Sequence, residues 1–188
     1  MSGDVWSELP LTAVALIIAI REIKMRPGMA LGTGLIGVAS LLGIFSFSGI
    51  KAALGPHDFV SLLAACVGMP LLAISLYWKE SIIATKLSAA VRFFLVVSAI
   101  SVILVPMLNF GLWSSITAAA SALLIFAAAL RSRLPVAIAG SVILVACFTL
   151  SAGNWVLAPL NADQQLHVLM AISLALLAIR WQSNQVSV

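Results

Sequence analysis

The feature that most constrains this chain is a succession of apolar runs, each roughly 20 residues long, separated by short polar turns. A helix of that length crosses the hydrocarbon core of a bilayer. Hydrophobic residues make up 63% of the chain and charged residues only 9%, whereas soluble domains carry roughly 25% charged residues. Such a chain cannot cover itself with polar surface. We therefore expect an all-α, polytopic membrane protein.

Seven runs meet the length requirement for a membrane-spanning helix. They cover about residues 5–23, 29–50, 58–78, 87–108, 112–130, 134–151 and 162–180. Little of the chain lies outside them, so we predict a single seven-helix transmembrane domain over residues 1–188 and no soluble domain. The first run opens with Asp4 and Glu8 rather than with basic residues, so we expect a retained span and not a cleaved signal peptide.

The basic residues are distributed unevenly between the two ends of these runs. Nine of the ten Lys and Arg residues lie where the first, third, fifth and seventh runs end or where the next run begins, and only Lys51 lies at the other side. Because Lys and Arg accumulate in cytoplasmic loops, this asymmetry predicts an outer N-terminus and a cytoplasmic C-terminus, in a bacterial-type inner membrane. The net charge of +4 is therefore explained by cytoplasmic loops beside the lipid bilayer. We expect the bilayer to be a partner of this chain and do not expect a nucleic acid to be one.

The second run is rich in glycine, and four glycines in it or directly before it are candidates for close helix packing. They are Gly28, Gly32, Gly37 and Gly43. Gly28 and Gly32 lie four residues apart, and so do Ala39 and Gly43. Small residues at this interval let helix backbones approach closely in a membrane. This face is expected either to pack against a neighbouring span of the same chain or to form a seam with a membrane-protein partner or a second copy.

The side opposite most of the basic residues holds both histidines of the chain and several carboxylates. We select five candidate site residues there: Glu8, His57, Asp58, Asp163 and His167. Asp163 and His167 lie four residues apart and so share one face of a helix. Ionisable groups at the mouth of a span are energetically costly and are often functional.

Several interpretations of these five residues stay open. They can be solvated groups in the headgroup layer, or a hydrogen-bonded network that closes the mouth of the bundle. A metal site built from His57, Asp163 and His167 is a third interpretation, because imidazole and carboxylate ligands suit zinc or iron. A haem held by the two histidines is a fourth.

Other classes of seven-span protein fit less well. A retinal protein needs a lysine in the middle of its last span, and residues 170–176 contain none. A proton relay needs acids or bases along its path, and the central thirds of the runs carry none. Cys66 and Cys147 both lie inside apolar runs, where a cysteine behaves as a small buried hydrophobe.

The architecture resembles the CREST superfamily of seven-span proteins, which includes alkaline ceramidases and adiponectin-receptor-like proteins. The resemblance rests on the seven runs, the acidic residue at the head of the first, the glycine-rich second and the histidine in the last. His167 is similar to the second histidine of the HxxxH pair in that family, Asp163 stands at the position of the first, and the second run has Ser46 and Ser48 but no histidine. The resemblance implies either a reduced zinc site or a member without a metal.

Three functions remain as hypotheses. The first is a non-enzymatic membrane protein that packs against a membrane partner or holds an apolar or lipid ligand. The second is a CREST-like, metal-dependent hydrolase of lipid amides or esters, and the third is a small-solute transporter. The first is favoured because the sequence contains neither a complete catalytic set nor a sizeable extramembrane domain.

Overall fold

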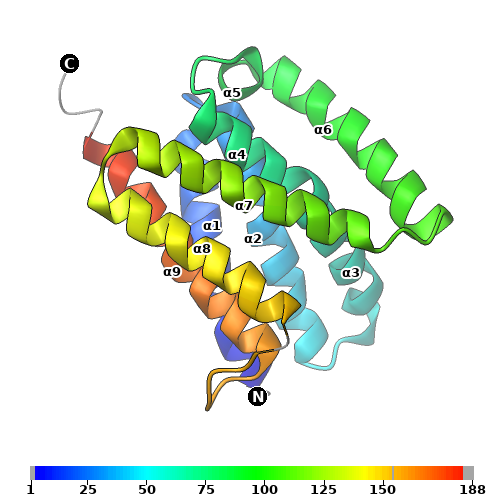
Figure 1. The fold of residues 1–188 in the computed structure, drawn as a ribbon. Helices are drawn as coiled ribbons and strands as arrows, with labels where there is room; N and C mark the ends of the chain where they lie inside the picture. The colour runs from blue at the N-terminus through cyan, green and yellow to red at the C-terminus, as the bar shows by residue number, and fades with distance from the viewer. Residues whose placement is uncertain (1–2, 154, 184–188) are drawn as a thin grey trace.

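The computed structural model describes the backbone of residues 3–153 and 155–183 and the side chains of residues 4–153 and 155–179. This part of the chain is helical and contains no β-strand (Figure 1). The longer helices are α1 (Gly3–Glu22), α2 (Pro27–Phe47), α3 (Leu54–Leu63), α4 (Met69–Tyr77), α6 (Leu87–Val102), α7 (Leu112–Ser132), α8 (Pro135–Ala152) and α9 (Ala162–Ser183). Shorter elements are the 3₁₀ turn η1 (Lys51–Ala53), the π-helical turns η2 (Ala64–Gly68) and η3 (Ile103–Met107), and α5 (Ile82–Thr85).

Six helical segments of the described residues are long and apolar enough to cross a membrane. They are Pro27–Phe47, Lys51–Tyr77, Leu87–Met107, Leu112–Ser132, Pro135–Ala152 and Ala162–Ile179. The prediction of an all-α membrane protein with several spans is confirmed at this level. Helix α1 is not among the six; it carries Asp4, Glu8, Arg21 and Glu22.

Six of the helices pack on one another in a closed ring. Around the ring, α1 packs on α2, α2 on α4, α4 on α7, α7 on α8, α8 on α9, and α9 on α1. Helix α3 packs on α2, whereas α6 lies at the edge of the bundle (Figure 1). The side chains of Met29, Ile36, Ile125, Leu144 and Leu174 are buried at the centre.

Proline positions explain several local features. Pro27 and Pro135 begin α2 and α8, where a missing N–H breaks no helical hydrogen bond. Pro70 instead lies inside the third predicted run, where its ring would clash with the carbonyl group of Cys66. The π-helical turn η2 includes Cys66 and lies immediately before α4. It widens the helix at this point, which accommodates the proline.

The structure differs from the predicted elements in detail. Helix α2 ends at Phe47, and the next helical segment already begins at Lys51, well before His57. The turn predicted over residues 79–86 contains the short helix α5. Ser81 caps α5, because its hydroxyl group accepts a hydrogen bond from the Ala84 amide at 3.2 Å.

The glycines of α2 meet neighbouring helices of the same chain. A Cβ atom at Gly28 would collide with the Ile83 carbonyl oxygen, and one at Gly32 would lie 2.6 Å from the Gly68 carbonyl oxygen. A Cβ atom at Gly37 would collide with the side chain of Leu16 in α1. These glycines therefore let α1, η2 and the α4–α5 region approach the backbone of α2 closely.

Candidate functional site

Three of the five candidate residues line one cavity. Glu8 comes from α1, His57 from α3 and His167 from α9, and the cavity has a volume of about 150 Å³. The Glu8 side chain is completely buried, although it is an acid. Asp58 and Asp163 are exposed and do not line the cavity. The structure thus brings together one carboxyl group and two imidazoles.

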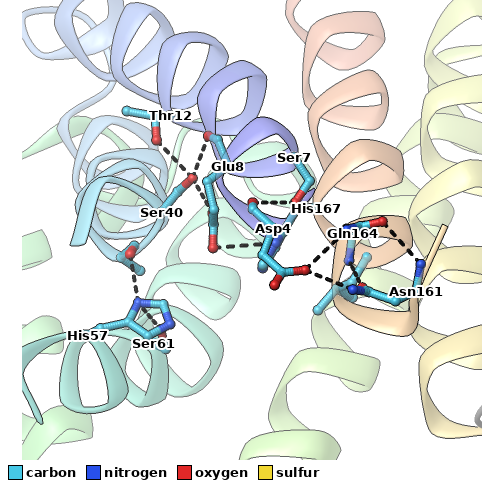
Figure 2. A network of polar contacts seen from close by, with 12 residues as sticks. Asp4, Ser7, Glu8, Thr12, Ser40, His57, Ser61, Asn161, Gln164 and His167 are labelled. Carbon is cyan, nitrogen blue, oxygen red and sulfur yellow. Dashed lines mark hydrogen bonds and ion pairs between the residues drawn. The ribbon is translucent and has the colours of Figure 1, made fainter. Parts of the chain in front are cut away.

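Glu8 is held by a hydrogen-bonded network between α1 and α2 (Figure 2). The hydroxyl group of Ser40 lies 2.6 Å from Glu8 Oε2 and 2.8 Å from the Glu8 carbonyl oxygen, and it donates to this pair. The same hydroxyl oxygen accepts a hydrogen bond of 2.8 Å from Thr12. Both hydroxyl groups are buried. This network fixes one oxygen of the carboxyl group and leaves the other for the cavity.

The second oxygen of Glu8 faces His167. Glu8 Oε1 lies 3.3 Å from His167 Nδ1, an ion pair if the ring is protonated. The relative orientation of the two groups does not make a hydrogen bond, and neither atom has a hydrogen-bond partner elsewhere in the described part of the chain. Buried polar atoms without partners are costly. A polar group of a ligand would satisfy both atoms.

His57 is oriented by the backbone of α2. Its Nδ1 atom lies 3.0 Å from the carbonyl oxygen of Ala39 and 3.5 Å from the hydroxyl group of Ser61. Because a carbonyl group only accepts hydrogen bonds, Nδ1 carries the hydrogen, and in the neutral ring Nε2 is then an acceptor. The edge of the ring also packs against Phe47, with 5.6 Å between the ring centroids.

Gly43 lets Glu8 and His57 approach α2. A Cβ atom at this position would lie 2.9 Å from the Glu8 carboxyl carbon and 3.1 Å from His57 Cε1. Both side chains therefore lie directly against the backbone of α2 at Gly43. The glycine that the sequence assigns to helix packing also makes room for the polar groups of the cavity.

Apart from Ser40 and Ser61, the remaining wall of the cavity is apolar, and part of it also belongs to a larger groove. The groove has a volume of about 520 Å³ and lies along α7 and α8. Ala65, Phe148 and Leu166 line both the cavity and the groove. The polar groups therefore lie at one end of a longer, largely apolar path between the helices.

A second polar network joins the beginnings of α1 and α9 (Figure 2). Asn161 and Gln164 form a reciprocal capping box: the Gln164 amide donates to Asn161 Oδ1 at 2.8 Å, and the Asn161 amide donates to Gln164 Oε1 at 3.2 Å. Both side chains also donate to Asp4 Oδ1, at 2.8 Å from Asn161 and 3.2 Å from Gln164. The first turn of α9 is thereby tied to α1, which positions His167 beside Glu8.

Gln165 fixes the loop that precedes α9. It is buried, accepts a hydrogen bond of 2.7 Å from the Leu157 amide and donates one of 3.1 Å to the Trp155 carbonyl oxygen. Sequence reasoning missed Ser40, Asn161 and Gln165. The capping box has a sequence signature, Asn-x-x-Gln, that identifies Asn161; nothing local distinguishes Ser40 from the other small residues of its helix.

The predicted metal site is not assembled as a complete ligand set. Among the described residues, no group of three or more His, Cys, Asp or Glu side chains is arranged to hold a metal ion. Asp163, the predicted third ligand, lies outside the cavity that His57 and His167 share. Of the three predicted ligands, the two histidines alone line the cavity.

No protein-family model matches the chain, and neither a curated protein nor a solved structure matches it.

Proposed function

We propose that this chain is a seven-span membrane protein that binds an amphipathic, lipid-like ligand in the cavity between α1, α2, α3 and α9. In this proposal α1 also spans the membrane, in addition to the six helical segments named above. Its exposed Ile17 and Ile20 suit contact with lipid, and its buried acid contacts the cavity rather than the hydrocarbon core. The distribution of Lys and Arg supports an outer N-terminus and a cytoplasmic C-terminus, in an inner membrane.

The single observation that carries the ligand proposal is the pair of unsatisfied atoms at the cavity, Glu8 Oε1 and His167 Nδ1. Small-molecule sites are typically apolar cavities with a few convergent polar groups. Here the polar groups are the carboxyl group and the two imidazoles, and the other lining residues are mostly apolar. A ligand with one hydrogen-bonding group matches this arrangement.

The size of the cavity indicates which part of a ligand it holds. A cavity of about 150 Å³ accommodates a group of roughly the size of benzene. The adjoining groove of about 520 Å³ provides room for an apolar tail. The polar end of the ligand then lies among Glu8, His57 and His167. Its apolar tail runs past Phe148 into the groove.

The test compares lipids that remain bound to purified protein. The full chain, His167→Leu and Asp163→Asn are extracted in detergent, and bound small molecules are identified by mass spectrometry. Asp163 is the matched control, because it is ionisable, lies one turn earlier in α9 and is exposed. Loss of one buried hydrogen bond lowers affinity about tenfold, so we expect His167→Leu to carry clearly less ligand than the wild type and Asp163→Asn to carry as much.

Two results would contradict the ligand proposal. One is a wild-type protein that carries no lipid-like molecule in stoichiometric amount. The other is a His167→Leu variant that retains the ligand as well as Asp163→Asn does.

A second candidate function is metal-dependent hydrolysis of a lipid amide or ester, as the CREST resemblance implies. The observation that favours it is the hydrogen bond between His57 Nδ1 and a backbone carbonyl group, since metal-binding histidines usually have their second nitrogen held in this way. The missing third ligand argues against it. Elemental analysis of the purified protein tests this function. Stoichiometric zinc that is lost in His167→Leu would support hydrolysis, and a wild-type protein without zinc would contradict it.

A further inference from the structure

A second groove lies between α5 and α6. Its volume is about 570 Å³, and its apolar wall consists of Ile82, Ile83, Phe93, Val96 and Val97. It shares no lining residue with the cavity described above. In Figure 1, α5 and the beginning of α6 lie at the end of the bundle far from the N-terminus.

The groove also contains two cations and no acid. Lys86 and Arg92 line it, together with the hydroxyl-bearing Ser88, and all three side chains are exposed. Neither cation forms an ion pair with another described residue. The groove therefore presents an uncompensated charge of about +2 beside an apolar surface, because Lys and Arg are charged at neutral pH.

The charged and apolar residues are ordered along α6. Lys86 precedes the helix and Arg92 lies about 9 Å farther along its axis, at 1.5 Å per residue. Val96 and Val97 follow about 6 to 8 Å beyond Arg92 by the same rise. This order matches a phospholipid, whose phosphate group lies above its first methylene groups.

Helix α6 is largely exposed in the described part of the chain. Of its residues, all of which the structure describes, only Ala90 and Ser101 are buried. The groove results from this loose attachment, because α6 leaves space beside α5 that side chains do not fill. Basic pockets between membrane helices are typical binding sites for anionic lipid headgroups.

We propose that the groove between α5 and α6 binds one anionic phospholipid. Lys86 and Arg92 bind its phosphate group, Ser88 donates a hydrogen bond to it, and Phe93, Val96 and Val97 contact the beginning of an acyl chain. The lipid would fill the space beside α5 and tie α6 to the bundle. This site is independent of the ligand cavity.

The test titrates the purified full chain with phosphatidylglycerol or with phosphatidylcholine and counts bound lipid by native mass spectrometry. The double variant Lys86→Gln/Arg92→Gln removes both cations. Arg133→Gln is the matched control, because Arg133 is an exposed cation at the α7–α8 turn that does not line the groove. Two cations at a lipid headgroup account for a factor of about 30 in affinity, which is about 2 kcal/mol.

We expect phosphatidylglycerol to bind more tightly than phosphatidylcholine, whose choline group offsets the phosphate charge. The double variant is expected to lose about 30-fold in affinity for phosphatidylglycerol and less for phosphatidylcholine. Arg133→Gln is expected to bind as the wild type does. Equal binding of the two lipids by the wild type would overturn the proposal. So would a double variant that binds phosphatidylglycerol as tightly as Arg133→Gln. Phe93→Ala tests the acyl contact separately: it is expected to weaken both lipids equally, and an unchanged affinity would remove the acyl-chain part of the proposal.

Discussion

Replacement of Ser40 by alanine tests whether the network around Glu8 stabilises the packing of α1 on α2. The Ser40 hydroxyl group is buried, donates to Glu8 and accepts from Thr12. Alanine fits the same space, so the substitution creates no clash. It removes the hydrogen bonds and leaves Glu8 Oε2 and the Thr12 hydroxyl group without their partner.

The expected loss follows from these contacts. A hydrogen bond between membrane helices contributes about 0.6 kcal/mol on average, and Ser40 has one donated to Glu8 and one accepted from Thr12. A buried polar group left without a partner costs about 1 to 3 kcal/mol more. We therefore expect Ser40→Ala to lower the free energy of unfolding by about 2 to 4 kcal/mol.

Unfolding in mixed detergent micelles, followed by circular dichroism, measures this change. Ser173→Ala is the control, because Ser173 is also fully buried in a long helix and its hydroxyl group has no hydrogen-bond partner among the described residues. That variant is expected to be neutral or slightly stabilised. If Ser40→Ala and Ser173→Ala unfold with the same free energy, the network does not contribute to stability and the reasoning is refuted.

Two further predictions use the same unfolding measurement. Gly32→Ala places a Cβ atom 2.6 Å from the Gly68 carbonyl oxygen and is expected to cost about 1 to 3 kcal/mol through overpacking. Gly34→Ala, on the same helix, meets only a methyl group at 3.7 Å and is expected to stabilise by up to about 1 kcal/mol through helix propensity; equal effects of the two would contradict the packing argument. Asn161→Ala is expected to cost about 1 kcal/mol through loss of the helix cap, and Asn161→Ser, which keeps an acceptor, less. An unaffected Asn161→Ala variant would show that the capping box does not stabilise α9.

The extent of the helices was readable from the sequence wherever an apolar run had clear ends. The run predicted at 112–130 lies within α7, because the turn at Gly111 precedes it and Arg131 and Arg133 follow. The beginning of the third run was harder to locate. Residues 51–56 contain Lys51, Gly55 and Pro56 and resemble a loop, yet they are helical and continue into α3.

The sequence predicted that the candidate site residues lie at one membrane surface, but it did not predict in which direction each side chain points. Successive residues of a helix point about 100° apart, so His57 and Asp58 cannot both face the cavity, and composition does not say which one does. Asp163 shares a helix face with His167 but lies about 6 Å nearer to the beginning of α9, at 1.5 Å per residue. That displacement leaves it exposed outside the cavity. Such distinctions depend on tertiary packing.

In the proposed arrangement the chain crosses the membrane seven times, and the cavity and most of the cations lie at opposite faces of the membrane. Asp58→Cys and Arg133→Cys, each in a background with Cys66 and Cys147 replaced by alanine, place a thiol on each face at exposed positions. A membrane-impermeant maleimide applied to intact cells measures which thiol is outside. We predict labelling at residue 58 and none at residue 133 until the membrane is opened. Labelling of both positions from the same side would contradict the account.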